Sequence, residues 1–160
     1  FYINISVYFH KNKGYNMQFN ITAGHVGIRP PVNLPDPRFL EVLGEEKIRK
    51  IVSDHYDLLR QSNIKGLFPP TDEGFEKAKE HSADFFIQIC GGPKYFNEKR
   101  GAPMMAARHS PFKINQEARR IWLESYAMVL APLDIEDDIK QSFWNYIDIF
   151  SIWMMNSNEN

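Results

Sequence analysis

Apolar side chains recur every three or four positions in four segments of the chain, a spacing that predicts helices with one buried face. The first two segments are residues 45–62 and 72–90. The third begins after Asn115 and ends at Pro132, and the fourth runs from residue 134 to 155. The pattern predicts a helical domain with four long helices. Their repeating positions are, in order, Ile48, Ile51, Val52, His55, Leu58 and Leu59; Phe75, Ala78, Ser82, Phe85, Phe86 and Ile89; Ala118, Ile121, Trp122, Tyr126, Val129 and Leu130; and Ile135, Ile139, Phe143, Tyr146, Ile147 and Phe150.

Residues that start or stop helices separate these segments. Thr71 and Asn115 suit the N-cap position, and the run of residues 91–93, Gly-Gly-Pro, ends the second helix. Four prolines within residues 27–37 prevent a regular helix and favour extended backbone. We therefore expect residues 17–37 to form an arm on the surface of the domain.

The segment between the second and third helices, residues 91–114, is polar and rich in glycine, and we expect a loop with one or two helical turns. So long an irregular stretch inside a compact domain requires something to organise it, and a bound ligand is one candidate. His109 lies in this segment, and a neutral imidazole is a good ligand for haem iron. Pro111 restricts the backbone after it, and Arg108 could pair with a carboxylate. From these residues alone, a histidine on a surface loop is the simpler interpretation.

Composition narrows the class of protein. A chain of 160 residues fits one domain, and 43% hydrophobic residues support a packed core. The net charge is −1, and the sequence has no run of basic residues typical of nucleic-acid binding. No apolar run reaches the roughly 18 residues of a transmembrane helix. The single cysteine excludes a disulfide framework and favours a reducing, cytoplasmic compartment. Residues 1–16 lack the order of a signal peptide, and we expect them to be an upstream extension, with Met17 as the start.

The segment GGPKYFNEKRGAPMMAARHSPFKI at residues 91–114, with RRIWL at 119–123, resembles the signature of truncated globins of the second group. The similarity covers the chain from about Arg38 to the last helix. It implies an all-α fold in which two antiparallel helix pairs sandwich haem, with a globin domain over residues 38–157. Residues 1–37, which precede this domain, are the arm expected from the prolines. The matching positions are Gly91, Gly92, Pro93, Arg100, Gly101, Arg108, His109, Pro111, Phe112 and Trp122.

The resemblance also implies a site. His109 would bind the iron of haem b, which is not covalently attached because no Cys-x-x-Cys-His motif is present. Tyr56 and Trp122 would donate hydrogen bonds to the distal ligand, and Ala78 and Ser82 would be the distal helix positions nearest the iron. The other residues expected to contact the cofactor are Arg108, Phe68, Phe85, Phe86, Phe112 and His81.

Several of these positions have a simpler interpretation, or depart from the pattern. Phe85 and Phe86 suit a core as well as a cofactor pocket, and His81 is a second iron ligand, a propionate partner or a rim histidine. Phe96 stands where the family usually has tyrosine, and Ser82 is polar where an aliphatic residue or glutamine is usual. The proline-rich arm has no counterpart in the pattern.

The resemblance implies reversible binding of O2, NO or CO, for transport, storage or sensing. An alternative is a haem enzyme, a nitric oxide dioxygenase or peroxidase, which would need a separate reductase as electron donor. A different class is a helical interaction module without a cofactor, with Trp153, Met154 and Met155 either exposed as a partner surface or packed in the core. We expect a monomer or homodimer that neither binds nucleic acid nor inserts into a membrane.

Overall fold

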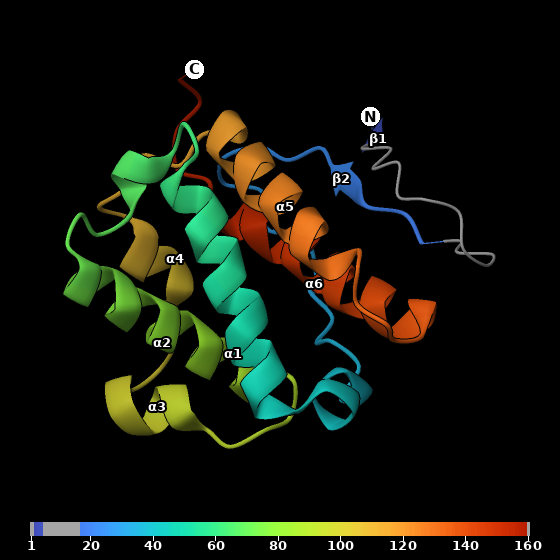
Figure 1. Ribbon diagram of the computed structural model, residues 1–160. Coiled ribbons are helices and arrows are strands. Elements are labelled where there is room, and N and C mark those ends of the chain that lie inside the picture. The colour runs from blue at the N-terminus through green and yellow to red at the C-terminus, as the bar shows by residue number, and fades with distance from the viewer. Residues whose placement is uncertain (1, 5–16, 160) are drawn as a thin grey trace.

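The computed structural model describes residues 2–4 and 17–159 (Figure 1). The expectation that the chain starts at Met17 concerns residues that lie largely outside this part. Strands β1 (Tyr2–Asn4) and β2 (Asn20–Thr22) pair antiparallel, a short addition that the apolar pattern did not predict. The helices are α1 (Arg38–Arg60), the short 3-10 helix η1 (Lys65–Leu67), α2 (Asp72–Ile89), α3 (Tyr95–Arg100), α4 (Met105–His109), α5 (Gln116–Leu130) and α6 (Asp137–Met154).

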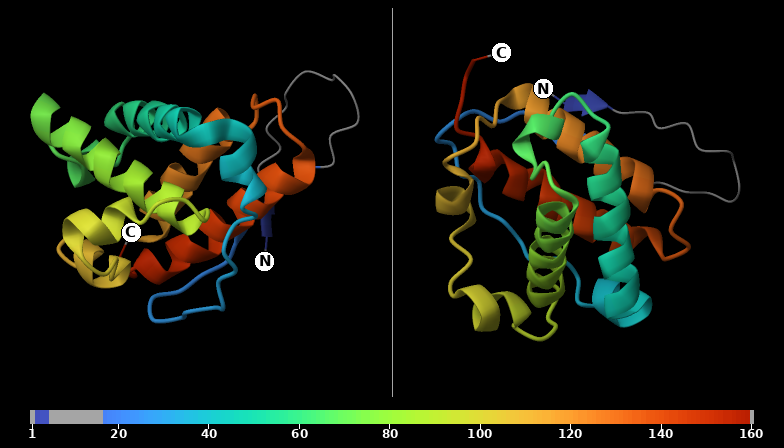
Figure 2. Two further views of the ribbon diagram at one scale, coloured as in Figure 1. Left: turned by 90° about the horizontal axis from the view of Figure 1, so that it is seen from below. Right: turned by 60° about the vertical axis from the view of Figure 1, so that its left-hand side comes forward.

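The four long helices form two layers. Helix α1 packs on α2 in one layer, α5 packs on α6 in the other, and α1 also contacts α5 and α6 (Figures 1 and 2). The short helices α3 and α4 lie in the connection between α2 and α5, where the sequence predicted a loop with one or two helical turns. The predicted helical fold with two helix pairs is confirmed.

Local sequence sets where these helices begin. The Thr71 hydroxyl accepts a hydrogen bond from the Gly74 amide at 3.1 Å, and the Asn115 side chain accepts one from the Ala118 amide at 2.8 Å, so both predicted N-caps are present. Helix α1 starts seven residues before the predicted helix, at Arg38, and is broken at Gly44, whose φ of 79° lies in the left-handed region. The predicted start is therefore the kink, and a short helical segment precedes it.

Aromatic rings join the two layers. Phe39 stacks on Phe143 with ring centroids 4.2 Å apart, and Phe86 lies 5.5 Å from Phe143 and 5.9 Å from Tyr126. All four side chains are almost fully buried. Because they come from α1, α2, α5 and α6, their burial holds the two helix pairs together.

The proline-rich arm lies along α6 (Figure 2). The indole N–H groups of Trp144 and Trp153 donate to the carbonyls of Asn20 and Pro30, each at 2.8 Å. The arm also buries Phe19 and Ile21. Helix α6 is consequently covered on more than one face.

This covering corrects one reading of the sequence, in which Trp153 and two methionines form an exposed partner surface. Met154 and Met155 are buried, and Trp153 is half-buried with its indole N–H engaged by the arm. These side chains pack inside the fold, which agrees with the second possibility given by the sequence analysis.

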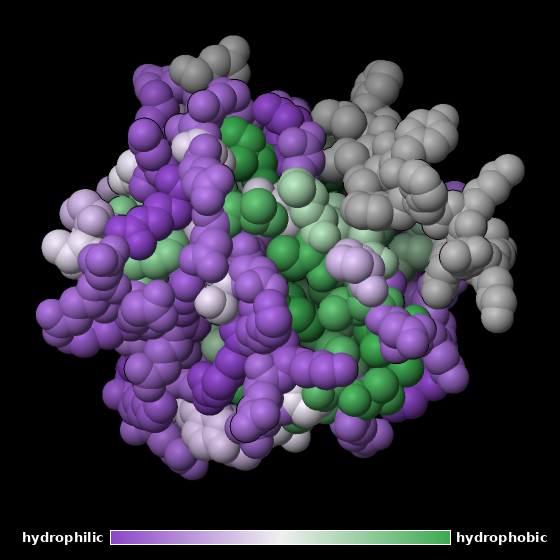
Figure 3. All heavy atoms as spheres, viewed as in Figure 1, coloured by the Kyte–Doolittle hydropathy of each residue, from purple (hydrophilic) through white to green (hydrophobic). Residues whose placement is uncertain are grey.

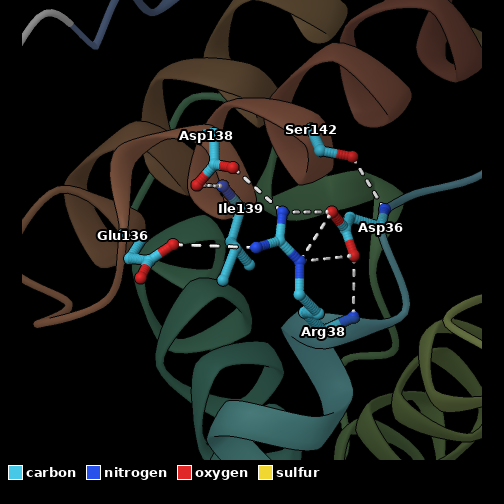
Figure 4. Close-up of polar contacts among 6 residues, drawn as sticks. All are labelled: Asp36, Arg38, Glu136, Asp138, Ile139 and Ser142. Carbon is cyan, nitrogen blue, oxygen red and sulfur yellow. Dashed lines mark hydrogen bonds and ion pairs between the residues drawn. The ribbon is translucent and has the colours of Figure 1, made fainter.

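The arm ends in a cluster of charged side chains at the start of α6 (Figure 4). The Arg38 guanidinium lies 2.7 Å from an oxygen of Asp36 and 2.9 Å from one of Asp138, and its hydrogen bonds lower the pKa of both carboxyl groups. The Asp36 amide also donates to the Ser142 hydroxyl at 2.7 Å. Arg38 and Asp138 are largely exposed and Asp36 is half-buried, so the cluster orients the arm more than it stabilises the fold.

The surface divides by polarity. Polar side chains cover the side formed by α1 and α2, whereas apolar ones gather over α5 and the start of α6 (Figure 3). Among the described residues, no helix combines the length and apolar character that crossing a bilayer requires.

Candidate functional site

A cavity of about 390 Å³ lies between the two helix pairs, with α4 on one side of it. Its lining is mainly apolar and aromatic, as is usual for a small-molecule or cofactor site. The structure brings all the residues that the resemblance assigned to the site to this one cavity. They are Tyr56, Phe68, Ala78, His81, Ser82, Phe85, Phe86, Arg108, His109, Phe112 and Trp122.

Tyr56 on α1 is held by aromatic neighbours. Its ring meets Phe68 and Phe75 at steep angles, with centroids 5.4 and 5.8 Å away. Burial raises the pKa of Tyr56, and the neighbouring Ser82 side chain offsets only part of that effect. The hydroxyl therefore keeps its proton and serves as a hydrogen-bond donor.

Trp122 on α5 supplies a second donor to the cavity wall. Its indole N–H has no hydrogen-bond partner among residues 17–159, in contrast to the indoles of Trp144 and Trp153. An indole N–H usually finds a partner when it is enclosed, so this group is available to a bound molecule.

His109 is the last residue of α4, and its ring orientation is set from within that helix. Its Nδ1 lies 2.7 Å from the Met105 carbonyl oxygen, so Nδ1 carries the proton and donates. In the neutral imidazole the Nε2 atom then keeps its lone pair, and it has no partner in the part of the chain that the structure describes. This is the tautomer of a metal-binding histidine, whose other nitrogen commonly donates to a backbone carbonyl.

Arg108 is engaged mainly with the backbone. Its Nε donates to the Pro103 carbonyl at 2.6 Å, and Nη2 donates to the carbonyls of Arg100 and Ala102 at 2.9 and 3.0 Å. The guanidinium also lies over the Phe96 ring, 5.0 Å from its centroid. Only Nη1 remains for the carboxylate that the sequence analysis expected Arg108 to bind.

A buried carboxylate, Asp84, organises a charged cluster of which Arg100 also lines the cavity. Burial alone would raise the pKa of Asp84, but hydrogen bonds from Arg49, Arg100 and Lys99 outweigh it, and the pKa is lowered. The nitrogen–oxygen distances are 2.8, 3.0 and 3.2 Å in the same order. This cluster ties α1 and α3 to α2.

His81 lies at the rim and is largely exposed, although it also lines the cavity. Partial burial and the nearby Arg100 lower its pKa, which favours a neutral imidazole. Its position agrees with the rim histidine of the sequence analysis. Whether it contacts a cofactor stays a prediction.

The sequence analysis missed Arg119, which is buried in the wall of the cavity. Its Nη2 lies 2.7 Å from Asp148, its Nε donates to the Ser151 hydroxyl at 2.9 Å, and its Nη1 donates to the Thr22 carbonyl at 2.7 Å. Arg119 directly follows Ala118, which belongs to the apolar stripe of this helix. A charged side chain so close to the buried stripe was a signal that Arg119 has a buried partner. Further lining residues that the sequence analysis had not assigned to the site are Phe96, Arg100, Met105, Ile114, Phe150 and Met154.

His55, one residue before Tyr56, is not among the residues that line the cavity. It is fully buried, its Nε2–H donates to the Trp122 carbonyl at 2.9 Å, and its ring stacks on Tyr126 at 3.5 Å. Desolvation lowers its pKa to about 3, so it is neutral. His55 therefore helps to position Trp122, which lines the cavity, without lining the cavity itself.

Comparison with known proteins places this site in a family. The family model for bacterial-like globins matches residues 39–156. The fold is similar to that of phosphate-bound Hell's gate globin IV, with a TM-score of 0.79, 36% identity and 87% of each chain covered. It also resembles a haemoglobin of Chloroflexus aurantiacus, with a TM-score of 0.69, 30% identity, and 80% of this chain and all of the other covered.

A relative found by sequence similarity supports the same family. Group 2 truncated hemoglobin YjbI of Bacillus subtilis (strain 168) is 29% identical over 121 residues, which are 74% of this chain and 89% of the relative. With this match, the two helix pairs and the cavity between them, the chain belongs to the bacterial-like globin family, as a homologue of the truncated haemoglobins of the second group.

Proposed function

We propose that this protein holds haem b non-covalently in the cavity, with His109 as the iron ligand, and binds a diatomic molecule such as O2, NO or CO. One observation carries the proposal: His109 borders an apolar cavity with Nδ1 committed to the Met105 carbonyl and Nε2 left free. Membership of the globin family supports the same cofactor.

The residues present fit haem for a second reason. Among residues 2–4 and 17–159, no three His, Cys, Asp or Glu side chains converge in a way that could hold a bare metal ion. A lone imidazole suits a metal whose remaining ligands belong to a cofactor. The aromatic side chains of Phe68, Phe85, Phe86 and Phe112 would pack against the porphyrin, and Arg108 Nη1 and His81 would face its carboxylates.

When bound, haem iron supplies an open coordination position at which a diatomic ligand attaches. Tyr56 and Trp122 would donate hydrogen bonds to that ligand, with Ala78 and Ser82 as the nearby positions on α2. A hydrogen bond to a charged or strongly polarised group contributes about 1.5–3 kcal/mol, which corresponds to roughly ten- to a hundredfold in affinity.

The test of iron ligation is the visible spectrum of the oxidised, reduced and CO-bound protein. His109→Ala should remove or strongly alter the Soret band that wild type acquires with haem, whereas His25→Ala, at an exposed histidine, should leave it unchanged. Unaltered haem uptake and absorption in His109→Ala would overturn the proposal.

The donor roles have their own test. Replacing Tyr56 or Trp122 with phenylalanine removes a donor while keeping an aromatic ring in the cavity. We expect O2 to dissociate about ten- to a hundredfold faster from either variant, because one hydrogen bond is lost. Stopped-flow measurement decides the matter, and unchanged rates in both variants would reject the donor assignment.

The hydroxyl and indole groups of Tyr56, Ser82 and Trp122 also favour a second function, oxidation of nitric oxide or reduction of peroxide with electrons from a separate reductase. Turnover of nitric oxide by the reduced, oxygenated protein separates an enzyme from an oxygen carrier.

We propose a cytoplasmic site of action, since a lone free cysteine, Cys90, suits a reducing compartment.

A further inference from the structure

Helix α4, which carries His109, has little to hold it in place by itself. It spans five residues, none of them buried, and no side chain caps its start. It follows Met104, whose φ of 41° and ψ of 48° place a non-glycine residue in the left-handed region. A helix this short is not stable alone in water, so contacts outside α4 must fix it.

On the N-terminal side, that support comes from Arg108. Its three hydrogen bonds to the carbonyls of residues 100, 102 and 103 close the loop between α3 and α4. They do not reach the segment that follows His109, residues 110–114.

On the C-terminal side, Asn156 contacts that following segment. Its Nδ2 donates to the Phe112 carbonyl at 2.7 Å and to the His109 carbonyl at 3.3 Å. Its Oδ1 accepts from the Ile114 amide at 2.8 Å, and its own amide donates to the Ile114 carbonyl at 2.9 Å. One exposed residue thus makes four hydrogen bonds to the chain between His109 and Ile114, and such a network acts cooperatively.

The position of Asn156 is itself well fixed. Met154 and Met155, which precede it at the end of α6, are buried in the fold. Beyond it, the Ser157 amide donates to the Ile114 carbonyl at 3.2 Å, and the Glu159 carbonyl accepts from the Asn115 side chain at 3.0 Å. The tail of residues 156–159 therefore joins α6 to the loop after His109.

We infer that Asn156 is a positioning residue for the proximal ligand: it holds the backbone from His109 to Ile114 and so aims the His109 imidazole into the cavity. The inference rests on the proposed function, in which His109 binds the iron. The inference adds Asn156, in the segment that follows α6, to the site. The sequence analysis had placed that site on α1, α2, the segment of residues 91–114 and α5.

The experiment compares Asn156→Ala with Asn158→Ala, a neighbouring exposed asparagine for which the described residues provide no hydrogen-bond partner. In the apoprotein, Asn156→Ala should speed hydrogen–deuterium exchange of the Ile114 amide. With haem bound, it should shift or broaden the iron–histidine stretching band in resonance Raman spectra and speed haem transfer to apomyoglobin about five- to tenfold, because three exposed side-chain hydrogen bonds of small net contribution are lost. Asn158→Ala should match wild type in all three measurements.

Asn156→Asp refines the test, because it keeps the acceptor for the Ile114 amide but replaces the donor to the two carbonyls with an oxygen. We expect its Raman band to change as in Asn156→Ala. If Asn156→Ala accelerates amide exchange while its Raman band and haem transfer equal those of Asn158→Ala, Asn156 is merely structural and the inference is overturned. A Raman band that persists in His109→Ala would instead defeat the proposed function.

Discussion

At the scale of single residues, His55 makes well-defined contacts with cavity-lining residues although it does not line the cavity itself. The His55 imidazole joins α1 to the Trp122 carbonyl and lies edge-on to the rings of both Tyr56 and Trp122, at 6.0 and 5.4 Å. Its Nδ1 and the Tyr126 hydroxyl are buried without a hydrogen bond of good geometry. A buried histidine with one free nitrogen is sensitive to protonation, because the charged form would have to be desolvated.

His55 therefore makes stability depend on pH. In the unfolded chain this imidazole binds a proton near its ordinary pKa of 6.5, whereas in the folded protein burial lowers the pKa to about 3. The unfolded state binds more protons between these values, so the free energy of unfolding should fall by about 1 kcal/mol for each pH unit below 6.5. Urea unfolding at several pH values should show this slope in wild type and a flatter one in His55→Phe; equal slopes would contradict it.

At the scale of elements, Gly92 lets the end of α2 lie close to the first segment of α1. A Cβ atom at this position would stand 2.7 Å from Ile87 Cγ2, 2.8 Å from the Ile87 carbonyl oxygen and 2.8 Å from Leu40 Cδ2. The backbone oxygen cannot move away as a side chain can. Gly91, with its φ of 92°, follows the C-cap of α2, and packing requires a second glycine directly after it.

Gly92→Ala should consequently lower the free energy of unfolding by about 1–3 kcal/mol, the usual cost of forcing a methyl group into a filled space. The matched control is Gly66→Ala, where an added Cβ meets nothing within 4 Å. Thermal or urea unfolding compares the two. A Gly92→Ala variant as stable as the control would show that the α2–α1 approach relaxes without cost.

The long helices were predictable from the sequence because their signals are local. Apolar spacing gave their faces, and the caps at Thr71 and Asn115 gave two of their starts. Helix α4 was less predictable, since it depends on hydrogen bonds from Asn156, 47 residues after His109. The site residues came from resemblance to a family pattern; periodicity alone treats His109 as an ordinary loop histidine.

At the scale of the whole molecule, the N-terminal arm is fastened through a buried ion pair. Asp148 accepts hydrogen bonds from the Thr22 amide and hydroxyl at 2.9 and 2.6 Å, and from Arg119 at 2.7 Å. The pair thereby connects the arm, α5 and α6. The sequence did not predict this connection, because nothing in the arm itself indicates which helix it covers.

Asp148→Asn should destabilise the protein by about 3 kcal/mol, because it leaves the buried Arg119 guanidinium without a counter-charge. The control is Asp138→Asn, which removes a carboxylate from the exposed Arg38 cluster and should hardly change stability. Urea unfolding monitored by tryptophan fluorescence measures both. Equal effects would mean that the buried pair contributes no more than the exposed one.

Arg119 gives the fold an additional property, since one guanidinium belongs both to the wall of the cavity and to the anchor of the arm. We therefore expect a molecule that fills the cavity to restrain the Arg119 side chain, which donates to the Thr22 carbonyl. A protease should then cut the arm between residues 23 and 35 more slowly when the cavity is filled, for colourless ligands as well as coloured ones.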